Sequence, residues 1–459
     1  MQIKLTDFSK VYFLGIGGIG MSALARYFLA EGFGVAGYDR VETALTIELI
    51  KEGCTINYSD RELIPSDFFS DIKETLIVYT PAIKKENVLL NYFISHGFIV
   101  LKRAEVLGLI TALTKSLCVA GTHGKSTTSS LLAHILSCSD TKFTAFLGAI
   151  ATNFNSNLVL HKDAEFIVVE ADEFDRSFLT LSPFAAIVTS VDPDHLDIYG
   201  SKESFLEGFE AFAAKINSAG LLVVKEGIVL PTKAEKITYA LFSASADYAI
   251  EELYYVDDIA YCSIRLKKEQ WSNVALGLPG IHNAENALAC VALLSELGVS
   301  AENILLGLKS FQGLKRRFET ILRTNKVIFI DDYAHHPTEI NALVTSLRLR
   351  FPSMKISGVF QPHLFSRTND FAKEFAVSLA ALDEVILLAI YPARELPMEG
   401  VTSEWLLSLI DHKDKKIMSK EELFHFVESF DSGVFVTIGA GDIDRLVLPI
   451  KDRLISNLV

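Results

Sequence analysis

The sequence has little that would support a disulfide-stapled, zinc-binding or membrane-embedded protein. Only five cysteines occur among the 459 residues, and none of them forms a C-x-x-C pair, so neither a disulfide framework nor a zinc site is predicted. No run approaches 18 uninterrupted apolar residues, and the opening segment MQIKLTDFSK lacks the apolar stretch of a signal peptide. These absences predict a soluble, cytoplasmic protein with reduced thiols.

Basic residues are also fewer than acidic residues. The chain has 43 Lys and Arg against 57 Asp and Glu, and its net charge is −14. Binding to nucleic acid or to an anionic membrane needs a surplus of basic residues, so we expect no nucleic-acid partner and no stable membrane association. Any anionic ligand must be bound by local donors, because the overall field repels it.

The chain is too long for a single hydrophobic core, and half of its residues are hydrophobic. Apolar strand-like runs alternate with amphipathic helical stretches, which is typical of parallel α/β domains. Between about 221 and 278 the pattern becomes β-rich and indicates an antiparallel patch. We predict an α/β protein of three domains: a Rossmann-like domain over 1–108, a central P-loop ATPase-type domain with a mixed sheet over 109–314, and a C-terminal Rossmann-like domain over 315–459.

A glycine-rich loop follows the first apolar run, in VYFLGIGGIGMSALARYFLAEGFGVAGYD. Its glycines are Gly15, Gly17, Gly18 and Gly20, and Asp39 follows the next short strand. Glycines let the backbone approach a diphosphate, the following helix offers N–H groups, and the acid can accept from a ribose hydroxyl. The loop therefore predicts a diphosphate site, and an NAD(P)-dependent oxidoreductase is one interpretation.

A second loop, GTHGKST, lies between a predicted strand and a predicted helix. Lys125 supplies a point charge for phosphates, and the Ser126 hydroxyl can bind Mg²⁺. The sequence of this loop departs from the usual phosphate-loop motif, since Val119 stands where the first glycine is expected. The predicted ATP-binding residues of this loop are Gly121, Thr122, Gly124, Lys125, Ser126 and Thr127. A glycine turn followed by a serine helix cap is the alternative.

Acidic residues follow the next strand, in EFIVVEADEFD. Glu170, with Asp172 and Glu173 beside it, suits Mg²⁺, which prefers a few carboxylates together with phosphates and water. A solvated turn would explain the same acids. The strand after it ends in DPDHLDIYG, and its position favours a role for His195 at the same site over that of an ordinary turn histidine.

Polar residues also follow two predicted strands of the C-terminal domain. FIDDYAHHPTE contains Asp331, Asp332 and the pair His335 and His336, and GVFQPHLFSRT contains His363 and Arg367. The aspartates could accept from ribose hydroxyls. An arginine at such a place can hold a carboxylate or a phosphate through two parallel hydrogen bonds.

Taken together, these stretches resemble the Mur ligase family of ATP-dependent, amide-bond-forming enzymes, over essentially the whole chain and in the same order. The stretches that carry the resemblance are GTHGKSTT, EADE, DHLDIYG, GIHNAENALA, KRRFE and DDYAHHPTE. The resemblance implies ATP and Mg²⁺ as cofactors and a place in peptidoglycan precursor synthesis. It also implies that the first glycine loop holds the diphosphate of a UDP-sugar.

The resemblance assigns roles to individual residues. It implies Lys125, Glu170 and His195 as catalytic residues and Ser126, Glu170 and His195 as metal ligands. Besides the second loop, the implied ATP-binding residues are Asn283, Asn286, Arg317 and Asp332. The implied UDP-sugar residues are Gly15, Gly17, Gly18, Gly20, Asp39 and His123, and the amino-acid side is given to His336 and Arg367.

Within the family, GIGGIGMSALA and FQPHLFSRT are most similar to members that join L-alanine to UDP-N-acetylmuramate. Members that attach a tripeptide to the same UDP-sugar are the alternative, and an oxidoreductase would leave the second loop unexplained. Some members order a second metal with a carbamylated lysine. The matching region of this chain holds Glu210, with Lys215 further on, so we expect a plain acid or water there.

Overall fold

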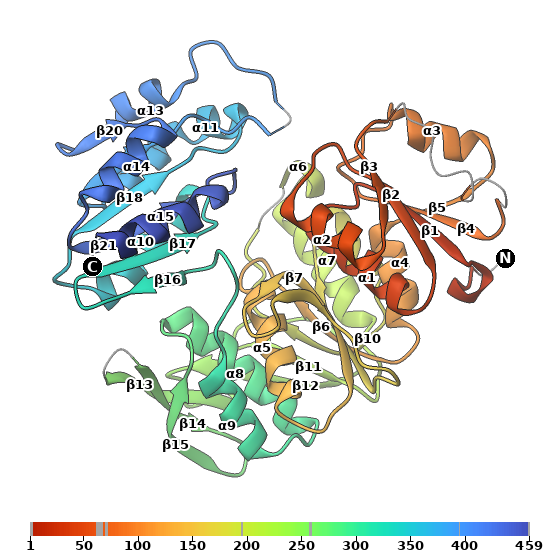
Figure 1. Cartoon of the computed structure of the whole chain (residues 1–459). Helices are drawn as coiled ribbons and strands as arrows, with labels where there is room; N and C mark the ends of the chain where they lie inside the picture. Colours follow the sequence, from red (N-terminus) through yellow and green to blue (C-terminus); the bar gives the residue numbers. More distant parts are fainter. Residues whose placement is uncertain are drawn as a thin grey trace. The chain divides into compact units, whose positions relative to one another are not determined.

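The computed structural model describes residues 3–60, 68, 72–193, 196–256, 259–393 and 395–457. Among these residues the strands form three sheets with helices packed around them (Figure 1). The α/β class and the three-domain architecture are thereby confirmed. By internal contacts the chain divides into two compact units, residues 1–313 and 314–459. The first two sheets belong to the first unit and the third sheet to the second.

The N-terminal sheet is parallel, with the order β3-β2-β1-β4-β5. Its strands are β1 (Lys10–Leu14), β2 (Gly34–Tyr38), β3 (Thr55–Asn57), β4 (Thr75–Tyr79) and β5 (Ile99–Lys102). A short 3-10 helix η1 (Leu5–Asp7) precedes them, and the helices are α1 (Ile19–Ala30), α2 (Ala44–Glu52), α3 (Val88–Ser95) and α4 (Arg103–Thr111). The strand order reverses between β1 and β4, and in such sheets ligands bind beyond the carboxyl ends at that point.

The central sheet has the order β15-β14-β13-β12-β11-β10-β6-β9-β7-β8. Its strands are β6 (Lys115–Ala120), β7 (Phe143–Ala151), β8 (Ser156–Val159), β9 (Phe166–Ala171), β10 (Pro183–Val188), β11 (Leu221–Lys225), β12 (Glu235–Leu241), β13 (Tyr248–Val256), β14 (Ile259–Arg265) and β15 (Gln270–Leu276). The sheet is mixed, as predicted. The antiparallel patch is smaller than expected, because β11 and β12 still pair in parallel and only β13 to β15 form antiparallel pairs at that end.

Helices cover this sheet and build its core. They are α5 (Lys125–Ser137), η3 (Phe174–Thr180), α6 (Leu196–Tyr199), α7 (Lys202–Ala214), α8 (Ile281–Glu296) and α9 (Ala301–Ser310). α7 presents fully buried phenylalanines to η3, and the rings of Phe178 and Phe212 stack with centroids 5.1 Å apart. The N-terminal and central domains share one hydrophobic cluster, so burial of apolar surface joins them into one unit.

The C-terminal sheet has the order β16-β17-β21-β18-β19-β20, with only β16 antiparallel to its neighbour. Its strands are β16 (Glu319–Arg323), β17 (Val327–Asp332), β18 (Ile356–Phe360), β19 (Glu384–Leu387), β20 (Lys415–Ile417) and β21 (Gly433–Ile438). The helices are α10 (Pro337–Arg350), α11 (Phe365–Asp370), α12 (Ala372–Leu379), α13 (Ser403–Leu409), α14 (Lys420–Glu428) and α15 (Asp444–Ser456). The central strands are wholly buried, as expected for a sheet covered on both faces.

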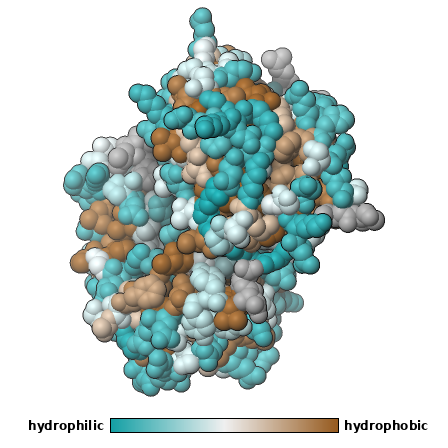
Figure 2. All heavy atoms as spheres, turned by 90° about the vertical axis from the view of Figure 1, so that its left-hand side faces the viewer, coloured by the Kyte–Doolittle hydropathy of each residue, from teal (hydrophilic) through white to brown (hydrophobic). Residues whose placement is uncertain are grey.

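Hydrophobic and hydrophilic side chains are interspersed on the face of the molecule shown in Figure 2. Among the residues that the structure describes, none of the helices has both the length and the apolar character needed to cross a membrane.

Candidate functional site

The second glycine loop joins β6 to α5, which begins at Lys125. Gly121 has a φ of +133° and Gly124 a φ of +80°, a conformation that favours glycine. A Cβ on Gly121 would lie 2.1 Å from Thr189 Oγ1, so only glycine fits there. The first N–H groups of a helix have no partner within the helix, and this loop presents them as an anion site.

Lys125 is held in a buried ion pair at this loop. Its Nζ lies 2.7 Å and 2.9 Å from the two oxygens of Glu173, and it donates to the carbonyl of Gly121 at 2.7 Å. The two side chains are only 12% and 2% exposed. Removing one partner of such a pair leaves a buried charge uncompensated, and the two short contacts with Glu173 fix the position of Lys125.

Ser126 and Glu170 form the neighbouring pair. The Ser126 hydroxyl donates to Glu170 Oε2 at 2.9 Å, and Glu170 lies at the carboxyl end of β9. A Cβ on Gly148 of β7 would lie 1.9 Å from the same oxygen, so the glycine makes room for this carboxylate. The acid cluster predicted from the sequence thus divides: Glu170 contacts Ser126, and Glu173 pairs with Lys125.

The donor set fits Mg²⁺, which binds one or two carboxylates together with phosphate oxygens and water. In the described parts of the chain, no three His, Cys, Asp or Glu side chains lie close enough to hold a metal by themselves, so ATP phosphates would have to complete the shell. His195, predicted as a catalytic residue and metal ligand, lies outside the described residues.

Thr122 and His123 face the end of β10. The Thr122 hydroxyl donates to the carbonyl of Asp192 at 2.7 Å, and the His123 N–H donates to Ser190 Oγ at 3.0 Å. The imidazole of His123 is 66% exposed, with Nε2 4.0 Å from Asp192 Oδ2. It is therefore open to a ligand, and its predicted contact with the UDP-sugar stays a prediction.

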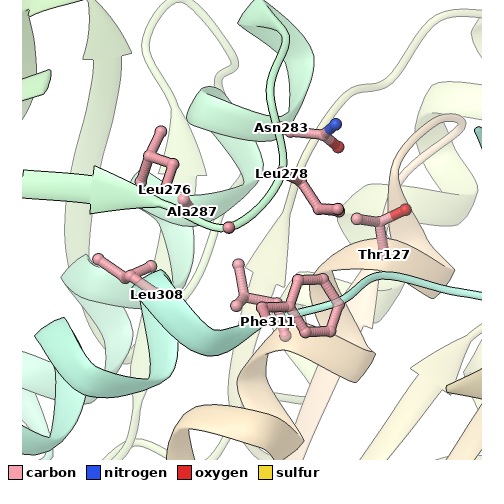
Figure 3. Close-up of a pocket in the computed structure, with 9 residues that line it drawn as sticks. Thr127, Leu276, Leu278, Asn283, Ala287, Leu308 and Phe311 are labelled. Atoms are coloured by element: carbon pink, nitrogen blue, oxygen red, sulfur yellow. The ribbon is translucent and has the colours of Figure 1, made fainter. Parts of the chain in front are cut away.

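Asn283 and Asn286 come from the first turns of α8. Asn283 donates to the carbonyl of Pro279 at 2.7 Å, and a Cβ on Gly124 would lie 2.7 Å from Asn286 Oδ1. Asn283 and Thr127 lie at one side of a small apolar cavity, opposite Leu276 and Leu308 (Figure 3). Both asparagines thus lie beside the second loop, and their predicted role toward ATP remains to be tested.

A larger cavity, of about 310 Å³, lies between the end of the first glycine loop and Glu170. One wall is the start of α1, from Gly18 to Leu24, and the other includes Phe146 to Gly148 of β7 with Glu170 and Asp172. The helix that follows the first glycine loop and the predicted magnesium acid therefore open on one space.

Arg103 also lines this cavity, and sequence reasoning missed it. It begins α4, directly after β5, and a Cβ on Gly20 would lie 2.5 Å from its Nη1. Its Nη2 lies 4.0 Å from Asp172 Oδ2. The signal available in the sequence was an arginine at a strand-to-helix junction, in IVLKRAE.

Asp39 shapes the first glycine loop. Its two carboxylate oxygens accept from the N–H groups of Gly17 and Arg40, each at 2.7 Å. Gly15 has a φ of +87°, and a Cβ there would lie 2.7 Å from Thr80 Cγ2. The contact of Asp39 with a ribose or sugar therefore stays a prediction, while its contact with the loop is observed.

In the second unit, Asp331 and Asp332 end β17 and are buried. Asp332 accepts from the N–H groups of Phe318 and Ala334, at 2.7 Å and 2.8 Å, and burial raises its pKa. Burial also raises the pKa of Asp331 to about 6, although Arg316 and a hydrogen bond from Thr437 favour its ionised form. Both aspartates therefore interact with groups of the C-terminal domain itself.

Arg317, His336 and Arg367 lie in the same unit. Arg317 Nη1 lies 3.6 Å from Glu339 Oε1. His336 caps α10, where its Nδ1 accepts from the N–H of Thr338 at 3.4 Å. Their predicted roles toward the nucleotide and the amino acid are not tested by these contacts.

Arg367 and His363 carry buried nitrogen atoms, Nη1 and Nδ1, that have no hydrogen-bond partner in the described structure. Burial and the charge of Arg367 lower the pKa of His363 to about 4. Buried polar groups are normally hydrogen-bonded, so these two atoms are available to a polar ligand.

Three family models match the chain in this order: "Mur ligase family, catalytic domain" at residues 10–115, "Mur ligase middle domain" at 119–294, and "Mur ligase, glutamate ligase domain" at 316–441. The chain belongs to the Mur ligase family. Members of this family are ATP-dependent ligases that generally use Mg²⁺. The resemblance stated from the motifs is thereby confirmed.

Curated relatives are similar over almost their whole length. A UDP-N-acetylmuramate–L-alanine ligase of Porphyromonas gingivalis strain W83 is 49% identical over 97% of this chain and 99% of the relative. One from Cytophaga hutchinsonii is 45% identical over 98% and 97%.

Two solved structures show the same fold. The UDP-N-acetylmuramate–alanine ligase of Thermotoga maritima superposes with a TM-score of 0.81 at 27% identity, over 98% of this chain and 99% of that chain. A murein peptide ligase of Psychrobacter arcticus superposes with a TM-score of 0.69 at 22% identity, over 98% of each chain, which is a likeness of fold alone.

The raised pKa of Asp331 predicts a pH-dependent stability of the C-terminal unit. The folded state binds this proton more tightly than the unfolded state, so the contribution of Asp331 to the free energy of unfolding rises as pH falls through about 6 toward 3.8. Asp331→Asn should remove this slope, which amounts to about 3 kcal/mol between the two limits.

Trp405 fluorescence during urea unfolding, in a Trp271→Phe background, reports on this unit. The control is Asp431→Asn at an exposed position, which should keep the wild-type slope. Parallel profiles for Asp331→Asn and the wild type would contradict the prediction.

Proposed function

We propose that this protein ligates L-alanine to the lactyl carboxylate of UDP-N-acetylmuramate, at the expense of ATP, in peptidoglycan precursor synthesis. The observation that carries the proposal is the single cavity shared by the first turn of α1 and by Glu170. Relatives with this activity in their names, at 45–49% identity over nearly the full chain, support it.

The UDP-sugar would bind to the N-terminal domain. The first turn of α1 and the loop glycines Gly15, Gly17, Gly18 and Gly20 suit a diphosphate, since a helix N-terminus binds anions through its backbone N–H groups. The guanidinium of Arg103, against Gly20, adds a positive charge at the same place. The muramyl group then extends through the cavity toward Glu170, with Asp39 and His123 as further predicted contacts.

ATP would bind to the second loop. The backbone of Gly121, Thr122 and Gly124 with Lys125 would hold the β- and γ-phosphates, and Thr127, Asn283 and Asn286 lie beside the loop for the rest of the nucleotide. Ser126 and Glu170 would hold Mg²⁺ with His195. When bound, Mg²⁺ neutralises charge on the phosphate oxygens.

The chemistry needs positioning more than covalent help from the protein. An oxygen of the lactyl carboxylate attacks the γ-phosphorus of ATP, the bond from the γ-phosphorus to the bridging oxygen breaks, ADP leaves, and the carboxylate becomes an acyl phosphate. The amine of L-alanine attacks its carbonyl carbon, a C–N bond forms, the C–O bond to phosphate breaks, and the amine loses a proton. Lys125 stabilises the negative charge of the phosphoryl group during transfer. Arg317 and Asp332 would contact the nucleotide, and His336 and Arg367 would contact the amino acid.

Two further points belong to the proposal. We place the domain boundaries at 1–108, 109–314 and 315–459, one sheet in each domain. We also place the protein in the cytoplasm, where ATP is available and where its cysteines, which form no disulfide in the described structure, would remain reduced.

Phosphate release by the purified protein tests the proposal. With Mg·ATP and UDP-N-acetylmuramate present, L-alanine should start the release, and omission of any one component should stop it. Release only with a tripeptide would assign the alternative of a peptide-recycling ligase. No release with any acceptor would contradict the ligase proposal, and NADH binding would then test the first loop as an oxidoreductase site.

Lys125→Ala should abolish turnover and leave the dissociation constant of UDP-N-acetylmuramate within a few-fold of wild type, because the sugar nucleotide binds to the other loop. Glu173 would be left buried without its cation, so the double variant Lys125→Ala/Glu173→Gln guards against unfolding. Lys142→Ala, at an exposed position, is the control. If Lys125→Ala weakened UDP-N-acetylmuramate binding as much as it reduced turnover, the assignment of residues to two separate sites would be wrong.

A further inference from the structure

One edge of the central sheet is covered by a helix of another domain. β8 is the terminal strand of the sheet and pairs only with β7 among the described strands. The ring centroids of Tyr27 in α1 and Phe146 in β7 lie 5.4 Å apart, so α1 packs on this β7–β8 hairpin. An edge strand presents unpaired backbone groups and needs such a cover.

At the centre of this contact lies Asn157 of β8, whose side chain is completely buried. Its amide Nδ2 donates to the carbonyl of Ile19 at 2.6 Å and to Ser22 Oγ at 2.9 Å. Its Oδ1 accepts from Arg26 Nη1 at 2.6 Å. Positions 19, 22 and 26 lie on one face of α1, so a single side chain of the central domain holds two turns of the helix.

Arg26 extends the network into the N-terminal domain. Its Nε and Nη2 each donate to Glu52 of α2 at 2.8 Å, and Nη2 also contacts Glu48 at 3.3 Å. The Arg26 side chain is only 12% exposed. The guanidinium therefore has a fixed geometry, which gives the hydrogen bond to Asn157 a defined direction.

This contact lies between the two halves of the proposed substrate site. Gly18, Ile19 and Gly20 at the start of α1 line the 310 Å³ cavity, and so does Gly148 of β7, which abuts Glu170. α1 thus contacts β7 in two ways, directly through Tyr27 and Phe146 and indirectly through Asn157 of the paired strand β8. A misplacement of about 1 Å between reacting groups can cost on the order of 100-fold in rate.

We propose that Asn157 is a positioning residue: it holds the diphosphate-binding helix α1 in register with Glu170, so that a substrate bound at α1 presents its carboxylate at the phosphoryl-transfer site. The inference rests on the proposed function and deepens it. Nothing in the catalytic motifs predicts this residue, because its effect passes through α1.

Two variants separate the contacts. Asn157→Asp keeps an acceptor for Arg26 but loses the donor to Ile19 and Ser22. Arg26→Lys keeps a charge beside Glu52 but loses the planar fork that reaches Asn157. We expect kcat to fall about tenfold or more in Asn157→Asp and less in Arg26→Lys. The dissociation constants of UDP and of ATP, each of which needs only one side of the contact, should stay within about twofold.

Asn87→Ala is the matched control. Asn87 caps α3 by accepting from the N–H of Leu90 at 3.0 Å, so its loss lowers stability without changing a contact of α1. This variant should keep the wild-type kcat. If Asn157→Asp also kept it while folded, or weakened UDP, ATP and stability together, Asn157 would be only structural and the proposal would be overturned.

Hydrogen exchange of the full chain provides a readout that does not depend on activity. In Asn157→Asp, exchange should become faster in the first turns of α1 and in β8 and stay unchanged in α5. Unchanged exchange in α1 would overturn the proposal even if the wild type proved inactive. Inactivity of the wild type with L-alanine would instead count against the proposed function alone.

Discussion

In a chain with a net charge of −14, the two proposed polyphosphate ligands would bind only where positive potential is concentrated locally. The structure does this with backbone N–H groups at the starts of two helices, α1 and α5, and with one basic side chain at each, Arg103 and Lys125. Both cations have a carboxylate partner, Asp172 and Glu173. Glycine is required at several positions of both loops because a Cβ there would collide with a neighbouring side chain, as Gly20 would with Arg103 and Gly121 with Thr189.

The two carboxylate partners differ in burial, and this difference sets their roles. Glu173 is 2% exposed and holds Lys125 within 2.9 Å, so the pair is part of the folded core of the loop. Asp172 is 39% exposed and lies 4.0 Å from Arg103, a weak surface contact that an incoming phosphate can replace. If the proposed assignments hold, the asymmetry makes the ATP loop preformed and the sugar site adaptable.

Much of this site was predictable because it is local in sequence. A glycine loop between a strand and a helix positions its own lysine and serine, and the end of a strand positions its acidic residue. Lys125, Ser126 and Glu170 lie at the places in loop, helix and strand that the motifs predicted. Asn157 was not predictable, since its contacts arise only when β8 meets α1 across the fold, and the place of Arg103 at a strand-to-helix junction did not by itself show that it lies against Gly20 of α1. The extent of the antiparallel patch was wrong for a related reason: strand direction depends on which neighbours pair, and composition does not determine that.

We propose that the cavity between the start of α1 and Glu170 brings the carboxylate of the bound sugar nucleotide to the phosphoryl-transfer site. A crystal structure of the chain with UDP-N-acetylmuramate, Mg²⁺ and a non-hydrolysable ATP analogue tests it most directly. The account predicts the diphosphate against the first turn of α1 and Arg103, with the lactyl carboxylate in the cavity facing Glu170. A diphosphate bound away from α1, or a carboxylate directed out of the cavity, would contradict it.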